Sequence, residues 1–254
     1  QVETKWGSII QAHLANIRYI IKQGDAEKVI FHSSNDMLIM DGLSEYLKDK
    51  KNIFHLRKCT SDSLWWVSKR AVKDFSVSIF FNHKLYASQI EGSMYDISLL
   101  KNLANDLDKQ DLILDSELFY PREEIIFSSF AYKEDIKPDG LPYIYSEIHN
   151  FDRCFFRYIE LFKFIAKRNC FLGKLFRRLL SDTLTVLNKD HINIPLIKSI
   201  LDRKYPGEKE IMLNDSLSLK WIVYDNHSLF GVKRVKRDLS DPVRKFISSR
   251  YIKI

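Results

Sequence analysis

Apolar residues recur at helical spacing near the start of the chain, in the stretch WGSIIQAHLANIRYIIKQGD (6–25). Isoleucine and leucine stand three or four residues apart there, which predicts an amphipathic helix. We expect this helix to end at Gly24, because glycine readily takes the left-handed backbone conformation that closes many helices. The apolar run that follows, KVIFH, leads into a polar turn and predicts a buried strand at residues 28–32.

The same pattern continues through the middle of the chain. A short helix is expected to begin near Asp41, and the acids that follow Pro121 in YPREEIIFSSFAYK predict the first turn of another helix. Apolar runs predict strands at residues 52–58 and 76–83. Two further elements are expected, an extended stretch reaching Gly92–Ser93 and a helix at Ser98–Leu107.

The second half of the chain begins with a predicted loop at residues 134–150, which contain turn-forming residues. Residues 151–187 are helical in pattern and rich in lysine and arginine. A strand candidate, LSLKWIVYD (217–225), and a helix at residues 241–252 follow. This alternation predicts the α/β class: a mixed sheet flanked by helices, with a helical subdomain around 151–187, in a single domain over residues 1–254.

Basic residues outnumber acidic ones, and the 254 residues carry a net charge of +7. Such an excess suits nucleic acid, an anionic membrane surface or a phosphorylated small molecule, and the charge alone does not choose among them. Three cysteines favour neither a disulfide framework nor a zinc site, so a reducing, cytoplasmic compartment is expected.

Several stretches resemble, in the same order, segments of the family 14 glycosyltransferases, which include the core-2/I-branching β-1,6-N-acetylglucosaminyltransferases and the peptide xylosyltransferases. KWGSIIQAHLANIRYI, followed by KVIFHSSND, is similar to the family's tryptophan-led helix, strand and Ser-rich turn. EGSMYDIS resembles the Gly-Ser-aromatic segment beside the acceptor, and YPREEIIFSSF resembles the family's Pro-acid-Glu helix start. HSLFGVKRV resembles the family's Leu-Phe-Ala-Arg-Lys-Phe segment.

The resemblance implies a GT-A-like fold and an inverting, metal-independent transfer of a sugar from a nucleotide donor, here a UDP-sugar, to a glycan acceptor. One carboxylate would be the general base that takes the proton of the acceptor hydroxyl. On the family's pattern this base is Glu124, because Ser129 lies five residues further on, and Glu123 is the reserve. Considered without the family, both are ordinary first-turn acids that the helix dipole favours.

Cationic side chains would stabilise the departing diphosphate in such a transfer. Lys233 matches the lysine of the family's Leu-Phe-x-x-Lys pattern, and Arg234 stands where the family has Phe. Gly231 and Val232 replace the usual Ala-Arg, and Lys220 is a poorer stand-in for the family's upstream arginine. The other cations of the KRVKR stretch fit a solvated basic surface or a membrane anchor equally well.

Six further residues are candidates for binding the donor or the acceptor: Asn35, Asp36, Gly92, Ser93, Tyr95 and Trp65. Asn35 and Asp36 suit hydrogen bonds to sugar hydroxyls or to the nucleotide, and they suit an ordinary turn equally. Gly92 would let the backbone approach a sugar, or simply form a tight turn. The ring of Trp65 could stack on a sugar, although tryptophan is more often found in a core.

Metal binding is not expected from the sequence. A manganese-dependent GT-A enzyme carries Asp-x-Asp at a strand end, whereas Asp106 and Asp108 fall at the end of a predicted helix. The seven histidines show no paired-ligand spacing. We therefore expect no metal and no cofactor besides the nucleotide sugar as co-substrate.

The leading hypothesis is a glycosyltransferase of bacterial surface-polysaccharide synthesis, located at the cytoplasmic face of the inner membrane. Six cations would form one side of an amphipathic helix that touches anionic lipid: Lys163, Lys167, Arg168, Lys174, Arg177 and Arg178. A non-catalytic nucleic-acid-binding protein would explain the charge but not the ordered motifs. An inactive scaffold is a third hypothesis, because the family's first strand and helix would precede Trp6 and only five residues do so here.

Overall fold

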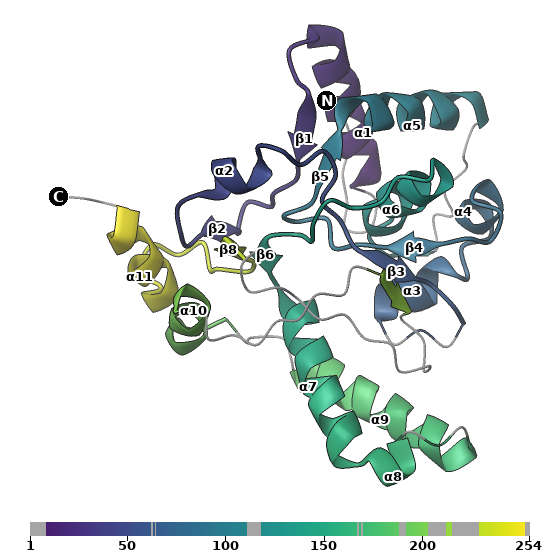
Figure 1. Ribbon diagram of the computed structural model, residues 1–254, viewed down its shortest axis with the longest axis vertical. Coiled ribbons are helices and arrows are strands. Elements are labelled where there is room, and N and C mark those ends of the chain that lie inside the picture. Colours follow the sequence, from purple (N-terminus) through teal and green to yellow (C-terminus); the bar gives the residue numbers. More distant parts are fainter. Residues whose placement is uncertain are drawn as a thin grey trace. The chain divides into compact units, whose positions relative to one another are not determined.

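The computed structural model of the protein describes residues 9–61, 63, 65–110, 118–166, 168, 170–187, 192–202, 212–214 and 229–251. The described helices are α1 (Ile10–Gln23), α2 (Leu43–Leu47), α3 (Trp66–Ala71), α4 (Phe75–Phe80), α5 (Ile97–Gln110), α6 (Glu123–Lys133), α7 (Glu147–Leu161), α8 (Lys163–Ala166), α9 (Phe171–Leu187), α10 (Ile194–Leu201) and α11 (Pro242–Tyr251) (Figure 1). The described strands are β1 (Lys28–Ile30), β2 (Met37–Leu38), β3 (Leu56–Lys58), β4 (Tyr86–Ala87), β5 (Met94–Asp96), β6 (Ile144–Tyr145), β7 (Met212–Asn214) and β8 (Gly231–Val232). The chain is therefore of mixed α/β class, with small sheets flanked by helices.

Contacts between residues divide the chain into two compact units. Unit 1 comprises Gln1–Phe31, Lys50–Gly140 and Ile211–Lys220. Unit 2 comprises His32–Asp49, Leu141–Glu210 and Trp221–Ile254. Each unit thus combines segments that are far apart in the sequence, and the single domain over the whole chain stays a prediction.

The described strands of unit 1 form two small sheets. In one, β1 and β5 pair antiparallel, with Val29 opposite Tyr95. In the other, β3 lies between β4, which is antiparallel to it, and β7, which is parallel. Every residue of α6 from Glu123 to Ala131 is buried, so this helix forms the centre of the unit's core, and its sequence is apolar on nearly every side.

The described strands of unit 2 form one sheet, in which β8 lies between antiparallel β2 and parallel β6. Its buried core joins this sheet to α10 and α11 through residues such as Tyr145, Val232, Ile197 and Ile247. The helices α7, α8 and α9 contact one another and form a hairpin, in which α9 runs back along α7 (Figure 1).

The structure confirms most of the predicted helices. α1 ends at Gly24, which has φ +80° and donates its N–H to Ile20 O at 3.2 Å. The helices α2, α5, α6 and α11 also lie where the sequence predicts them. The predicted strand at 28–32 exists as β1, but it is not buried: Ile30 is 43% exposed, because β5 is its only partner among the described strands.

The strand predicted at residues 76–83 is wrong, because α4 occupies most of this stretch. Asp74 is fully buried and accepts the N–H of Val77 at 3.2 Å, which caps the first turn of the helix. A short apolar run fits a strand and a buried helix equally well. Here the cap that Asp74 supplies favours the helix.

The loop predicted at residues 134–150 is wrong at its end, where β6 and the first turn of α7 lie. His149 Nδ1 accepts the N–H of Ser146 at 3.1 Å and so closes that turn. The helical region predicted at 151–187 is confirmed as most of α7 together with α8 and α9. Arg177, however, is 2% exposed and does not belong to a basic surface.

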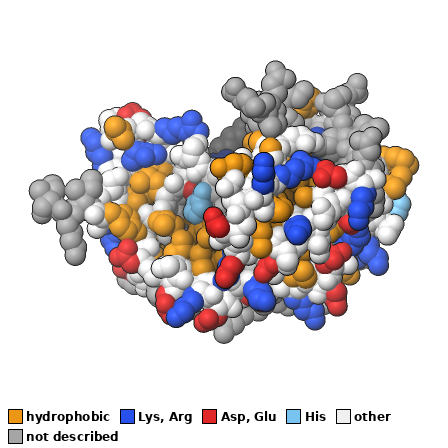
Figure 2. Space-filling view, turned by 90° about the horizontal axis from the view of Figure 1, so that it is seen from above, with side chains coloured by type: hydrophobic (Ala, Val, Ile, Leu, Met, Phe, Trp, Pro, Cys, Tyr) orange, Lys and Arg blue, Asp and Glu red, His pale blue; other side chains and the backbone are white. Residues whose placement is uncertain are grey.

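Four predictions fall outside the described residues: Trp6, Lys167, Lys220 and the strand at 217–225. Within the described part, every helix is too short or too polar to cross a membrane. On the face drawn in Figure 2, basic and acidic side chains are interspersed. The positive net charge is thus not gathered into a single patch on that face.

Candidate functional site

The N-terminus of α6 carries a buried pair of carboxylates in unit 1. Glu123 and Glu124, the predicted catalytic acids, are 4% and 7% exposed. Burying a carboxylate is costly unless charges, hydrogen bonds or dipoles compensate, and the N–H groups of a helix's first turn supply part of that compensation. This pair is the centre of the candidate site.

A buried ion pair fixes the start of α6. Arg122 Nε lies 2.9 Å from Asp74 Oδ2, and the Tyr120 hydroxyl donates to the same oxygen at 2.9 Å. Burial, followed by the nearby Asp74 charge, raises the pKa of Tyr120. Because Asp74 also caps α4, one carboxylate links the first turns of two helices. Asp74 was not among the residues predicted from the sequence, although an Asp before a short apolar run is a helix-start signal.

The segment that leads into EGSMYDIS lies against the same helix. The Ser88 N–H donates to the Glu124 carbonyl oxygen at 2.7 Å, and Ser88 Oγ accepts the N–H of His55 at 2.9 Å. Gln89 Nε2 donates to the Glu91 carbonyl oxygen at 2.6 Å. Within EGSMYDIS itself, the Tyr95 ring lies 5.5 Å, centroid to centroid, from the Phe127 ring of α6, so two of the stretches that carry the family resemblance meet in unit 1.

Gly92, Ser93 and Tyr95 serve the turn and the core behind this segment. Gly92 has φ +77°, which favours glycine, and its N–H donates to Phe31 O at 2.9 Å. Ser93 Oγ donates to a carbonyl of its own turn at 2.6 Å. Tyr95 is 1% exposed, and its ring stacks on Phe54 with centroids 5.4 Å apart. Of the two roles that the sequence left open for Gly92, the structure shows the tight turn.

Unit 1 also contains the fully buried His55, the half-buried His13 and a further buried acid, Glu91. Burial lowers the pKa of His13, and the charge of Glu91 partly opposes this effect. Burial, and secondly the charge of Arg57, hold the pKa of His55 well below its ordinary value. Glu91 is itself 9% exposed. The sequence analysis did not single out Glu91, although it is the first residue of EGSMYDIS.

Trp65 lies at the border of the unit 1 core, where it is partly buried. The guanidinium carbon of Arg57 lies 5.5 Å from the centroid of its ring. This cation–π contact covers one face of the indole. A sugar would have to stack on the other face.

A second polar cluster, in unit 2, combines the SSND turn with the KRVKR segment. The Val235 N–H donates to the Asn35 carbonyl oxygen at 3.0 Å, and Arg237 donates a hydrogen bond to the Ser34 hydroxyl. The Asp36 side chain is 1% exposed and accepts a backbone N–H of its own turn at 2.7 Å. The Asp36 carboxylate therefore stabilises the turn, which is one of the two roles that the sequence left open.

Two of the three predicted phosphate-binding cations, Lys233 and Arg234, follow β8 in the same cluster. Lys233 is half-buried, and its N–H donates to Tyr145 O at 2.8 Å. Arg234 has φ +65°, and its Nη2 lies 2.5 Å from Glu147 Oε1. The structure thus brings Lys233 and Arg234 together with the SSND turn in unit 2.

Gly231 stands at a sterically crowded position of unit 2. A Cβ at this position would lie 2.5 Å from Ile144 Cδ1 and 2.9 Å from Met37 O. β8 is the middle strand of its sheet, so neighbouring strands on both sides cause this crowding. Local packing thus favours glycine at this position.

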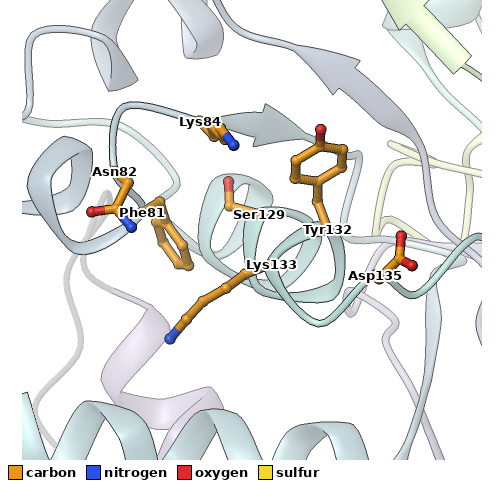
Figure 3. Close-up of a pocket in the computed structure, with 7 residues that line it drawn as sticks. All are labelled: Phe81, Asn82, Lys84, Ser129, Tyr132, Lys133 and Asp135. Atoms are coloured by element: carbon orange, nitrogen blue, oxygen red, sulfur yellow. The ribbon is translucent and has the colours of Figure 1, made fainter.

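A separate pocket of about 330 Å³ lies beside the C-terminal half of α6 (Figure 3). Ser129, Tyr132 and Lys133 reach it from α6, and Phe81, Asn82 and Lys84 reach it from the segment before β4. The Tyr132 ring stacks on Tyr86, with centroids 4.0 Å apart. Neither Glu123 nor Glu124 lines this pocket.

The Asp-x-Asp pair is engaged with cations of the protein. Asp106 Oδ2 lies 2.7 Å from Lys133 Nζ, and Asp108 Oδ1 lies 2.5 Å from Arg18 Nη2. Both carboxylates are partly exposed at the C-terminal end of α5. Metal independence stays a prediction.

Compared with protein-family models, curated proteins and solved structures, the chain matches none of them. The resemblance to the family 14 glycosyltransferases therefore stays a prediction that rests on the quoted motifs.

Proposed function

We propose that the chain is an inverting, metal-independent glycosyltransferase with a GT-A-like fold. It would transfer a sugar from a UDP-sugar to a glycan acceptor in bacterial surface-polysaccharide synthesis. The observation that carries the proposal is the hydrogen bond from Ser88 N–H to the Glu124 carbonyl oxygen, 2.7 Å long. It joins the segment before EGSMYDIS to the helix start that bears the predicted base.

Glu124 is assigned the role of general base, with Glu123 as the reserve. The acceptor oxygen forms a bond to the anomeric carbon while the bond from that carbon to the diphosphate breaks, and the acceptor's proton passes to the carboxylate. The Asp74–Arg122 pair holds the helix start in place, which fixes the position of the base. Glu91, another buried glutamate of this unit, serves as the comparison.

Lys233 is assigned to the leaving nucleoside diphosphate, where negative charge accumulates as the bond breaks. Arg234 is the weaker candidate, because its guanidinium lies in an ion pair with Glu147. A phosphate that binds Arg234 would have to compete with that carboxylate.

Thermal-shift measurements test the proposal. We expect UDP and a UDP-sugar to stabilise the protein equally with and without EDTA, and a DNA duplex to have no such effect. Lys233→Ala should reduce the shift caused by UDP, whereas Lys245→Ala, which removes an exposed lysine of α11, should not. Stabilisation by the duplex alone would overturn the proposal, and a UDP effect that EDTA abolishes would overturn its metal-free part.

A further inference from the structure

Large apolar side chains are exposed on the hairpin of α7, α8 and α9 in unit 2. Phe164, Phe171 and Leu172 are 75%, 77% and 66% exposed, and they lie on α8 and at the start of α9. Leu161 at the end of α7 is 66% exposed. We call these four residues the hairpin tip.

The apolar surface continues along α9. Its buried residues, Gly173, Arg177, Ser181 and Leu184, are spaced by four, four and three positions and mark the side that packs within the protein. Leu172, Leu175, Leu179 and Val186 are exposed and follow the same periodicity. With 3.6 residues per turn, the two rows lie on opposite sides of the helix. α9 therefore carries an apolar row on its outer side, where a surface helix is normally polar.

Local contacts hold the hairpin tip in place. A Cβ at Gly173 would lie 2.2 Å from Arg168 O and 2.8 Å from Ile165 O, so α9 approaches the preceding backbone as only glycine allows. The buried Arg177 donates hydrogen bonds to the carbonyl oxygens of Ala166 and Arg168. The backbone that carries the exposed aromatic rings is thus fixed by its neighbours.

Cations border this apolar surface. Lys163, Arg168, Lys174 and Arg178 are exposed, and the exposed acids of the hairpin are Glu160 and Asp182. Long basic side chains can extend from an apolar surface towards anionic head groups. An aromatic and aliphatic surface with a basic border is typical of helices that lie in a membrane interface.

We propose that the hairpin tip and the outer side of α9 bind the surface of an anionic lipid bilayer, with Phe164 and Phe171 at the boundary between head groups and acyl chains. The exposed cations around the apolar surface favour an anionic partner. A second copy of the chain would bring the same cations together, and nucleic acid would leave the apolar row without a partner. The proposal does not depend on the glycosyltransferase activity.

Co-sedimentation with vesicles tests the proposal. We expect binding to vesicles that contain phosphatidylglycerol and much weaker binding to phosphatidylcholine alone. Phe164→Ser combined with Phe171→Ser should weaken binding to the vesicles by about tenfold or more. The reason is that two phenyl rings are no longer transferred from water into the bilayer. Phe75→Ser, at a 73% exposed position on α4, is the matched control and should bind as the unchanged protein does.

Charge reversal separates the electrostatic part of the binding. Lys174→Glu with Arg178→Glu should remove the preference for phosphatidylglycerol, whereas Lys101→Glu with Lys109→Glu on α5 changes the net charge equally and should not. The absence of vesicle binding, or an equal loss in the Phe75 control, would overturn the proposal. A dimer in sedimentation equilibrium that dissociates in the Phe164/Phe171 variant would instead assign the surface to a second copy.

Discussion

Each of the two polar clusters contains an ion pair, which is buried in unit 1 and partly exposed to solvent in unit 2. The Asp74–Arg122 pair of unit 1 is 2.9 Å long, and its side chains are 0% and 4% exposed. The Glu147–Arg234 pair of unit 2 is 2.5 Å long, and its side chains are 30% and 43% exposed. Removing one partner of a buried pair leaves a charge without compensation in the interior, whereas the partner of an exposed pair is solvated by water. The first pair thus supports the fold, whereas the second contributes little to it.

The largest effect should come from the buried pair. Asp74→Ala should lower the free energy of unfolding by about 3–5 kcal/mol, because Arg122 loses its counter-charge and α4 loses its cap. Urea denaturation measures this change. Asp108→Ala, which breaks the partly exposed pair with Arg18, is the control and should cost about 1 kcal/mol or less. Equal losses in the two variants would contradict the comparison.

Steric crowding, rather than charge, should dominate in unit 2. Gly231→Ala should cost about 1–3 kcal/mol, because the new methyl group meets Met37 O and Ile144 at short distance. Gly24→Ala is the control: φ is +80° there, but a Cβ would have nothing within 4 Å. It should cost about 1 kcal/mol from backbone strain alone. The urea midpoints of the two variants show whether Gly231→Ala is the more destabilising. A larger loss in Gly24→Ala would mean that the packing around β8 is loose.

The buried histidine should make unit 1 sensitive to acid. The folded-state pKa of His55 is lowered, so below about pH 6.5 the unfolded chain binds a proton that the folded chain does not. The free energy of unfolding should therefore fall with decreasing pH, at up to about 1.4 kcal/mol per pH unit. In His55→Gln this slope should be smaller, with His13 supplying part of the remainder. Urea titrations from pH 7 to about 5 measure both slopes, and identical slopes would contradict the assignment to His55.

The exposed pair should contribute least to stability. Arg234→Ala should change the free energy of unfolding by about 0–1 kcal/mol, because both side chains of the pair are partly solvated. The change is measured by urea denaturation. A loss comparable to that of Asp74→Ala would show that the unit 2 pair is structural as well.

The sequence predicted the α/β class and most helices because periodicity and capping signals are local. α1, with its Gly24 end, and α6, with its acids after Pro121, are examples. It failed at α4, where a cap supplied by Asp74 outweighs an alternating pattern that also fits a strand. It also failed to anticipate that β1 is an exposed edge, since strand partners come from distant segments.

For the candidate site, the motifs named residues but not the long-range contacts that those residues make. Glu123 and Glu124 are buried, and the link from Ser88 to Glu124 joins residues 36 positions apart and has no local signal. The Asp74–Arg122 pair has the same character, with 48 positions between its members. Such long-range contacts depend on packing that periodicity does not encode.

Release of UDP from UDP-sugars in the presence of a panel of glycan acceptors tests the central claim most directly. Glu124→Gln should keep nucleotide binding and lose transfer by about 10²–10⁴-fold, the usual contribution of a general base. Glu91→Gln should retain most of the activity. Undiminished transfer by Glu124→Gln would contradict the assignment of the base, and the absence of both UDP binding and transfer in the unchanged protein would contradict the proposed function.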